Sequence, residues 1–405
     1  ISGPDRRALL AMGAAEIDGD VLSELDESIR EAVIEALPHG ALAEAMRTLE
    51  TDDVVDILED LDRPQQDIIL RALDDRDRAA VQQALSFPEH SAGRLMQREV
   101  VVAPEHWTVG DATDHLRGAD WLPDQFYHVV LVDPRMRPTG YATLGRILSS
   151  ASDVRLKDIV EDSFRTIEAV MPEEDVAYLF NQYHLISCPV VAEGGRLVGV
   201  ITIDDAMAVL DEEAEEDMLR LAGVGDGSSP ADGPFSTVRQ RLPWLVVNLF
   251  TASISAFVIS QFEATIAMIV SLAAVMPIVS STGGIGGTQS LAVSVRALAT
   301  RDLTSANAAR VVKRELVAGL LNGISLALIL GIGGAVLYGD VRLGIVLGLA
   351  MVANQIVAAL GGVLVPLTLE KYGLDPALAS GTFVTTLTDV MGYLTFLGLA
   401  TWLMT

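Results

Sequence analysis

The sequence predicts a multidomain, mainly α-helical membrane protein whose first part is soluble and acidic. Half of its 405 residues are hydrophobic, an unusually high share for a soluble chain. The formal net charge of −27 arises before residue 241, where there are 48 acidic and 20 basic residues; the remainder holds 7 acidic and 8 basic residues. A third observation is an internal duplication within residues 91–207. The charge contrast separates a soluble region from a membrane region.

Composition also limits the function. An acidic surface is a poor partner for nucleic acid, because phosphate binding needs basic patches. It suits cations, although solubility or salt adaptation explains the acidity equally well. The six histidines are scattered and no nucleophile or P-loop motif is present, which argues against an enzyme. The single Cys188 excludes an intramolecular disulfide and agrees with a reducing cytosol. No initiator Met opens the chain, so we expect the true N-terminus to be missing.

Residues 1–90 are predicted to form a small all-α acidic domain. Short segments such as DDVVDILEDL and PQQDIILRAL repeat apolar residues at three- and four-residue steps. Asp74 and Pro64 stand where a helix cap and a first turn belong. Asp52 and Asp56 lie four residues apart on one helix face and would repel each other if unpaired. A bound cation and a solvated face both account for this pair.

Residues 91–207 repeat the order strand, helix, strand, turn, strand, helix at an offset of about sixty residues. The first unit contains FYHVVLVDPRMRPTGYATLGRIL, and the second contains HLISCPVVAEGGRLVGVITIDDAM. This α/β pattern resembles a tandem pair of CBS domains, regulatory modules that often bind adenine nucleotides. The resemblance implies ATP as a candidate ligand, with Tyr127 as the stacking residue. Nucleotide-binding pairs often have an aspartate after the last strand of the first unit, where this chain has Gly145 and Arg146.

Residues 208–238 are predicted to hold the rest of a connecting helix and then a flexible linker, GVGDGSSPADGP. The helix carries eight carboxylates: Asp204, Asp205, Asp211, Glu212, Glu213, Glu215, Glu216 and Asp217. Without counter-ions such a helix repels acidic neighbours, which makes it a candidate switch element. A solvated spacer helix is the alternative.

Residues 239–405 are predicted to form a transmembrane domain of five helices. The apolar segments are 243–262, 264–299, 311–337, 343–369 and 376–404, each long enough to span a bilayer. The second is expected to kink at Pro277 and its glycine cluster. Basic residues gather before the first segment and in the second and fourth connections, which places these on the cytoplasmic side of the (inner) membrane. An odd number of spans then places the C-terminus outside.

Asp389 is the one charged residue of the last thirty. An ionised carboxylate at that depth costs ~2.5–3.5 kcal/mol on insertion scales, and such residues usually mark an ion or proton path. A protonated, purely structural Asp is the alternative. Thr385 lies four residues earlier and shares its helix face. Hydroxyl and carboxylate oxygens suit a hard cation that keeps most of its water.

Polar and small residues of the other segments have two interpretations. The glycines at 283, 284, 286 and 287 expose backbone carbonyls to a cavity or allow helices to pack closely. Asn322, Asn354 and Gln355 are predicted to link helices rather than to bind ions.

The whole chain resembles the MgtE family of bacterial magnesium channels. The resemblance rests on the domain order and on STGG..G.QS...VRALATRDL (281–303), LDPAL (374–378) and TTLTDVMG (385–392). It implies a homodimer in the lipid bilayer, with a pore on the dimer axis and Asp389 as the central site for hydrated Mg²⁺. It also implies that carboxylates of the N-domain, the CBS pair and the connecting "plug" helix sense Mg²⁺. The matching positions are Asp52, Asp56, Asp205, Glu213, Glu216 and Asp217.

The chain departs from the family pattern at four positions. Ile285, Thr288 and Gly381 stand where the family usually has pore asparagines, and Ala208 stands where it has a sensing carboxylate. The resemblance therefore predicts a passive divalent-cation channel, closed by internal Mg²⁺, without specifying the ion selectivity. Two alternatives are an ion-coupled exchanger that uses Asp389 as the coupling carboxylate, and a membrane sensor built on the CBS pair.

Overall fold

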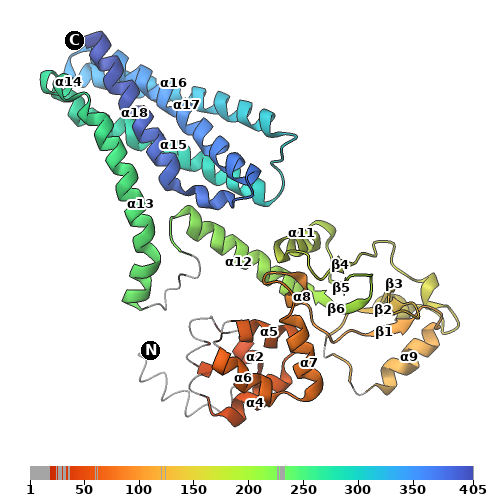
Figure 1. Ribbon diagram of the computed structural model, residues 1–405. Helices are drawn as coiled ribbons and strands as arrows, with labels where there is room; N and C mark the ends of the chain where they lie inside the picture. The colour runs from red at the N-terminus through yellow and green to blue at the C-terminus, as the bar shows by residue number, and fades with distance from the viewer. Residues whose placement is uncertain are drawn as a thin grey trace. The chain divides into compact units, whose positions relative to one another are not determined.

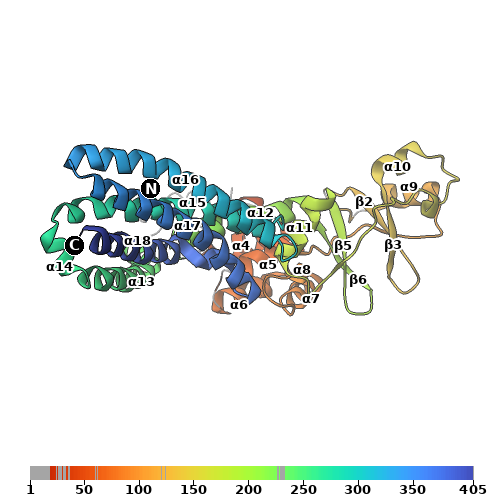
Figure 2. The ribbon, with the colours of Figure 1, turned by 90° about the horizontal axis from the view of Figure 1, so that it is seen from above.

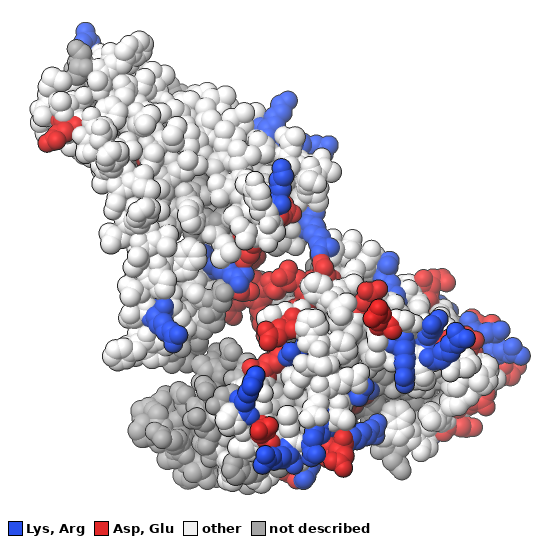
Figure 3. All heavy atoms as spheres, in the orientation of Figure 1, with Lys and Arg blue, Asp and Glu red and all other residues white. Residues whose placement is uncertain are grey.

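The computed structural model divides into two compact units, Ile1–Glu213 and Ala214–Thr405 (Figure 1). The structure describes residues 19–23, 25, 30, 33–34, 37–59, 61, 63–119, 121–123, 125–225, 228 and 233–404. Charged side chains crowd the surface of the first unit, whereas the visible face of the helical second unit is mostly uncharged (Figure 3). The contrast in charge along the sequence is thus a contrast between two folded units.

The first unit begins with a group of short helices. They are α2 (Gly19–Ser23), α4 (His39–Thr48), α5 (Thr51–Glu59), α6 (Arg63–Ala72) and α7 (Asp75–Ala84). Their apolar stripes enclose one core, which contains Ile57, Leu58 and Ile69 at 0% exposure. Asp74 caps α7 as expected, accepting hydrogen bonds from the backbone of Arg76 and Asp77. The prediction of an all-α N-terminal region is confirmed.

Two three-stranded sheets follow, each with one parallel and one antiparallel pair. After α8 (Ala92–Leu95), the first repeat comprises β1 (Val102–Pro104), α9 (Val109–Gly118), β2 (His128–Val132), β3 (Pro138–Thr143) and α10 (Leu144–Ser149). After a 3-10 turn η1 (Leu156–Asp158), the second comprises β4 (Ile167–Glu168), α11 (Glu173–Tyr183), β5 (Ser187–Val191), β6 (Leu197–Thr202) and α12 (Ile203–Leu221). The strand pair His128 and Thr143 in the first sheet corresponds to the pair Ser187 and Thr202 in the second. Each residue lies 59 positions before its counterpart. The predicted duplication and its α/β order are confirmed.

The two hairpin turns both contain positive φ angles but use different residues to adopt them. Gly194 and Gly195 provide the positive φ angles of the second turn, 95° and 79°. The first turn contains no glycine, and Met136 adopts a φ of 59°. There Asp133 Oδ1 accepts two backbone hydrogen bonds of 2.8 Å, from Arg135 and Arg137, which stabilise the turn. An aspartate side chain thus replaces the glycine pair.

Long helices form the second unit. They are α13 (Pro234–Ser260), α15 (Ser271–Ala299), α16 (Ala308–Tyr338), α17 (Val341–Lys371) and α18 (Ser380–Met404), and Figure 2 shows them side by side. Among the described residues, four of them, α13, α16, α17 and α18, are long and apolar enough to cross a membrane. α15 is of similar length but carries a run of glycine, serine and threonine. α17 is apolar all round and the most buried of the four, so it lies inside the bundle. α13 and α16 leave large side chains such as Leu249 and Ile329 exposed, as lipid-facing helices do.

The second apolar segment differs from expectation. We expected one helix over 264–299 with a kink at Pro277. Instead, α14 (Glu263–Met268) ends before Ile269, whose φ of −128° and ψ of 80° are not helical, and α15 begins at Ser271. Pro277 lies inside α15. The Thr265 and Thr401 hydroxyls lie 2.9 Å apart and hold α14 to α18 at one end of the bundle, so the chain turns there and not at the proline.

The glycines of α15 meet the neighbouring helices closely. An added Cβ at Gly283 would lie 2.0 Å from Asn354 Nδ2, and one at Gly287 would lie 2.6 Å from Val384 Cγ1. Asn354 and Gln355 of α17 donate hydrogen bonds to the α15 carbonyls of Val279 (3.0 Å) and Thr282 (3.1 Å). The structure favours the close-packing interpretation of these glycines, and the predicted linking role of both amides is confirmed. Asn322, by contrast, is exposed on α16.

Replacing Gly283 with Ala is expected to destabilise the bundle by about 1–3 kcal/mol, because the fully buried, hydrogen-bonded Asn354 cannot move aside. Gly333→Ala on α16 is the matched control, since no atom lies within 4 Å of its added Cβ. Thermal unfolding of the detergent-solubilised chain measures both. Equal midpoints for the two variants would contradict close packing at Gly283.

Candidate cation sites

Asp389 lies half-buried on α18, the helix that carries it into the bundle. Its Oδ1 accepts a hydrogen bond from the hydroxyl of Ser280 on α15. No Lys or Arg pairs with it in the described part of the chain. A 3-10 turn, η2 (Pro376–Ala379), precedes α18, so Asp389 lies about 20 Å from the start of this segment. A carboxylate without a counter-ion at this depth has a strong preference for a mobile cation.

Three threonine hydroxyls lie within about a turn of Asp389. Those of Thr385 and Thr386 donate to the carbonyl of Thr382 at 3.1 and 2.6 Å, and that of Thr388 donates to Thr385 at 2.9 Å. Because each proton is used within the helix, the oxygen lone pairs are left as acceptors. Thr385 is half-buried on the face of Asp389, whereas Thr388 is fully buried. Thr385 is therefore the better placed of the two to line a path.

Glu315 is a second acid of the membrane unit, and its surroundings differ from those of Asp389. It lies near the start of α16, accepts a 3.2 Å hydrogen bond from Ser290 and pairs with Arg314 at 3.1 Å. Its charge is thus balanced by a neighbouring guanidinium. Asp389 differs from Glu315 in having no such guanidinium partner among the described residues.

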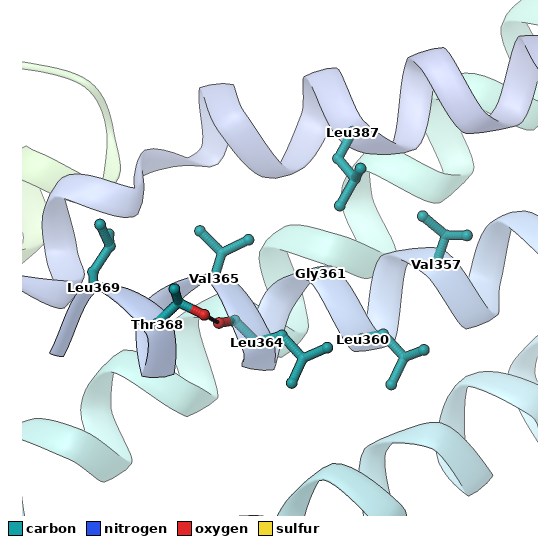
Figure 4. Close-up of a pocket in the computed structure, with 8 residues that line it drawn as sticks. All are labelled: Val357, Leu360, Gly361, Leu364, Val365, Thr368, Leu369 and Leu387. Atoms are coloured by element: carbon teal, nitrogen blue, oxygen red, sulfur yellow. Dashed lines mark hydrogen bonds between the residues drawn. The ribbon is translucent and has the colours of Figure 1, made fainter. Parts of the chain in front are cut away.

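An apolar cavity of about 400 Å³ lies beside α17 and α18 (Figure 4). Its lining residues are Val357, Leu360, Gly361, Leu364, Val365, Thr368, Leu369 and Leu387. A single threonine hydroxyl is the only side-chain oxygen among them. Such a lining offers a hydrated cation almost no oxygen and no charge, so this cavity is a poor candidate for a cation site.

The predicted sensing carboxylates of the first unit lie partly together. Asp52 is buried at 8% exposure on α5, and Asp205 stands at the start of α12. Burial and then nearby carboxylates, Asp205 first, raise the pKa of Asp52 well above its usual value. Burial likewise raises the pKa of Asp205 to about 6, although Thr202 donates to its carboxylate at 2.5 Å. Burial and the charge of Glu99 raise the pKa of Glu50 to about 7. These acids resist carrying full negative charge side by side.

The other predicted sensing residues have different surroundings. Asp56 forms a 2.6 Å ion pair with Arg30 and so is not the unpaired neighbour of Asp52 that the spacing suggested. Glu216 pairs with Arg220, which also pairs with Asp375 ahead of η2. Glu213 and Asp217 are half-buried on α12. Among the described residues, no group of three or more His, Cys, Asp or Glu is arranged to hold a metal ion directly. Since Mg²⁺ keeps several waters, binding through its hydration shell needs no such group.

The candidate nucleotide residue, Tyr127, precedes β2 and leaves 41% of its surface exposed. Its hydroxyl donates to Gln125 at 3.3 Å. Arg146 occupies the position where nucleotide-binding CBS pairs often have an aspartate. It forms an ion pair with Glu161 at 3.4 Å.

Ser280 is the site residue that the sequence analysis missed. Thr385 could be found from its spacing to Asp389 on one helix, but Ser280 lies 109 residues away on α15. Only the packing of α15 against α18 brings its hydroxyl to the carboxylate. The sequence did hold one signal for Ser280: its hydroxyl lies one turn before the glycine cluster, and such glycines mark where helices pack closely against each other.

Comparison with known families finds three matches along the chain. A profile described as a divalent cation transporter matches residues 276–399, one for the MgtE intracellular N domain matches residues 1–90, and one for the CBS domain matches residues 156–212. The chain is therefore a multi-pass membrane protein with an intracellular N-terminal domain. Its membrane part is of a transporter family rather than an enzyme family.

Several magnesium transporters named MgtE are similar over most of their length. The one from Thermus thermophilus is 34% identical over 86% of this chain and 78% of its own, and that from Enterococcus faecalis is 33% identical over 80% and 71%. The one from Bacillus subtilis is 29% identical over 94% and 85%. A solved cytosolic domain of the Mg²⁺ channel MgtE, in complex with ATP, is 30% identical over 52% of this chain and 86% of that chain, with a TM-score of 0.48. The chain belongs to the MgtE family of magnesium transporters.

Proposed function

We propose that the chain is a passive divalent-cation channel that carries Mg²⁺, in which Asp389 and Thr385 line the ion path. The observation that carries this proposal is the half-buried carboxylate of Asp389, which no Lys or Arg neutralises in the described residues. Nearby hydroxyls add oxygen acceptors, and residues 239–405 hold no His or Cys. This ligand chemistry favours a hard, hydrated cation over a soft metal.

A homodimer suits a path of this kind. Asp389 remains half-buried in one chain, so one copy supplies one side of a path and a second copy would supply the other. We assign residues 1–90 to the N-domain, 91–207 to the CBS pair, 208–238 to the plug helix and linker, and 239–405 to the transmembrane domain. Five spans with the N-domain inside the cell would leave the C-terminus outside.

Internal Mg²⁺ would close the channel by bridging acidic elements. The sensing residues would be Asp52, Asp56, Asp205, Glu213, Glu216 and Asp217. Asp52 and Asp205 support this role best, because burial and, after it, nearby carboxylates raise the pKa of both. Low Mg²⁺ would leave this repulsion unscreened and separate the elements. The ion can shift the equilibrium only by its preference for the closed state.

Adenine nucleotide is proposed as a second ligand of the CBS pair. The partly exposed side chain of Tyr127 supports stacking of the base. The nucleotide would act only as a bound ligand of the CBS pair and would take part in no reaction.

Flux into liposomes that contain the full chain tests the proposal. Mg²⁺ entry is expected to follow its own gradient, to exceed Ca²⁺ and Na⁺ entry, and to be unchanged when a pH gradient is imposed. A channel needs no coupling ion. Flux that stops when the pH gradient is collapsed would instead identify an exchanger that uses Asp389 as its coupling carboxylate.

A further inference from the structure

The side chain of Asn354 lies where three membrane helices meet. It is fully buried on α17 and donates from Nδ2 to the carbonyl of Val279 on α15, 3.0 Å away. An added Cβ at Gly283 of α15 would lie 2.0 Å from Nδ2, and one at Gly392 of α18 would lie 2.9 Å from it. Both neighbouring helices thus present a glycine to this amide. The side chain sets how closely α15 and α18 approach at this level.

These contacts flank the candidate cation site on both helices. Val279 directly precedes Ser280, whose hydroxyl donates to Asp389. Gly392 follows Asp389 by about one helical turn. A side chain from α17 therefore holds the turn of α15 that carries the donor against the turn of α18 that carries the acceptor.

Asn354 is a costly way to link helices. Its Oδ1 is buried and has no hydrogen-bond partner in the described part of the chain. A buried, unpaired acceptor destabilises a fold, and each such group in a native structure calls for an explanation. An apolar side chain in its place would leave no unpaired acceptor. What it would lose is the bond that fixes Val279.

We propose that Asn354 is a positioning residue of the cation site, which holds the Ser280 hydroxyl on Asp389 Oδ1 and so leaves Oδ2 directed at the water shell of the ion. The proposal rests on the proposed role of Asp389 as the ion site. A carboxylate that is already fixed in one rotamer loses no side-chain conformational entropy when it binds a hydrated cation. Asn354 itself does not touch the ion.

A double-mutant cycle on the full chain in liposomes tests this. Ser280→Ala and Asn354→Leu are each expected to raise the Mg²⁺ concentration for half-maximal flux by about tenfold, as expected for losing one hydrogen bond to a charged group, and to change the maximal flux less. Because Asn354 acts through Ser280, adding Asn354→Leu to Ser280→Ala is expected to cause no further rise. Asn354→Ala takes the place of Asn354→Leu should the leucine not fit between the glycines.

Gln355→Met is the matched control. Gln355 is the adjacent buried amide on α17 and makes the same kind of bond to a carbonyl of α15, at Thr282, but neither Ser280 nor Asp389 is next to that bond. Its loss is expected to lower thermal stability and to leave the half-saturating concentration unchanged. A merely structural role for Asn354 predicts the same behaviour for both amides.

Either of two results overturns the positioning role: effects of Ser280→Ala and Asn354→Leu that add in the double variant, or a half-saturating concentration that neither substitution raises. Asp389→Asn, measured alongside, separates this from failure of the proposed function. If Asp389→Asn conducts like the parent, both proposals fall. If it does not conduct and the cycle is additive, only the positioning role falls.

Discussion

Replacing Asp389 with Asn is expected to lower Mg²⁺ flux into liposomes by about 100-fold. Asn keeps the volume of Asp and an oxygen that can accept from Ser280, so the change removes charge and little else. An attraction of about 3 kcal/mol is of the size expected for a divalent ion held across one layer of water from a partly buried carboxylate, and it corresponds to about two factors of ten. Uptake of Mg²⁺, followed with an indicator dye inside the vesicles, measures the loss.

Asp340→Asn is the control for Asp389→Asn. Asp340 caps α17 at the edge of the bundle, where its side chain accepts a 2.8 Å bond from the backbone of Arg342. Asn caps helices as well as Asp does, so this variant is expected to fold and to conduct normally. Equal flux through Asp389→Asn and the parent would rule out Asp389 as the ion site, and equal losses in both variants would point to misfolding.

Much of the fold could be predicted because each element has a local signal. Period-3.6 apolar stripes predict the helices of the first unit, and the repeat in 91–207 predicts two sheets of one topology, which the registers starting at His128 and Ser187 bear out. The break at Ile269 had no such signal. Pro277 was the stronger local cue, and the contact between Thr265 and Thr401 near the break joins residues that are distant in sequence.

Only those residues of the candidate sites that charge or helix spacing reveals could be predicted from the sequence. Asp389 is conspicuous because one carboxylate among thirty apolar and polar residues is costly in a membrane. Its partners Ser280 and Asn354 come from other helices and depend on how glycines let those helices meet. Likewise, the four-residue spacing predicted that Asp56 and Asp52 repel each other. In the structure Arg30 forms an ion pair with Asp56 and balances its charge. Non-local packing decides which polar groups share a site.

Mg²⁺-free protein is expected to lose local stability around Asp52 and Asp205 as the pH rises from about 4 to 7. The pKa of Asp205 is raised to about 6 and that of Glu50 to about 7, and the pKa of Asp52 is also raised. In the unfolded chain such carboxyls titrate near 4. Folding therefore takes up protons between about pH 4 and pH 7, so this contribution is complete below about pH 4 and is lost as the pH passes 6 and 7. For Asp205 alone, a pKa raised from about 4 to about 6 corresponds to a loss on the order of 3 kcal/mol.

Mg²⁺ is expected to reverse that loss at pH 8, because a divalent cation replaces the protons that the cluster has released. Hydrogen exchange of the full chain measures it as protection of residues 51–59 and 203–213, with and without millimolar Mg²⁺. Asp205→Asn is expected to flatten the pH dependence and to reduce the protection by Mg²⁺, since one of the repelling charges is gone. Asp153→Asn, an exposed carboxylate outside the cluster, is the control and should behave like the parent.

The same measurement decides whether this cluster can close a channel. An ion shifts a two-state equilibrium only by the difference between its affinities for the two states, and moving from 1:99 to 99:1 takes about 5.5 kcal/mol. One ion relieving about 3 kcal/mol at a single carboxylate such as Asp205 falls short of that, so several ions bound along α5 and α12 would have to act together. A steep Mg²⁺ dependence of protection that Asp205→Asn makes shallow fits this requirement. Protection that does not respond to Mg²⁺, or that rises with pH in its absence, would show that the cluster is no sensor and that the acidity of the first unit serves solubility alone.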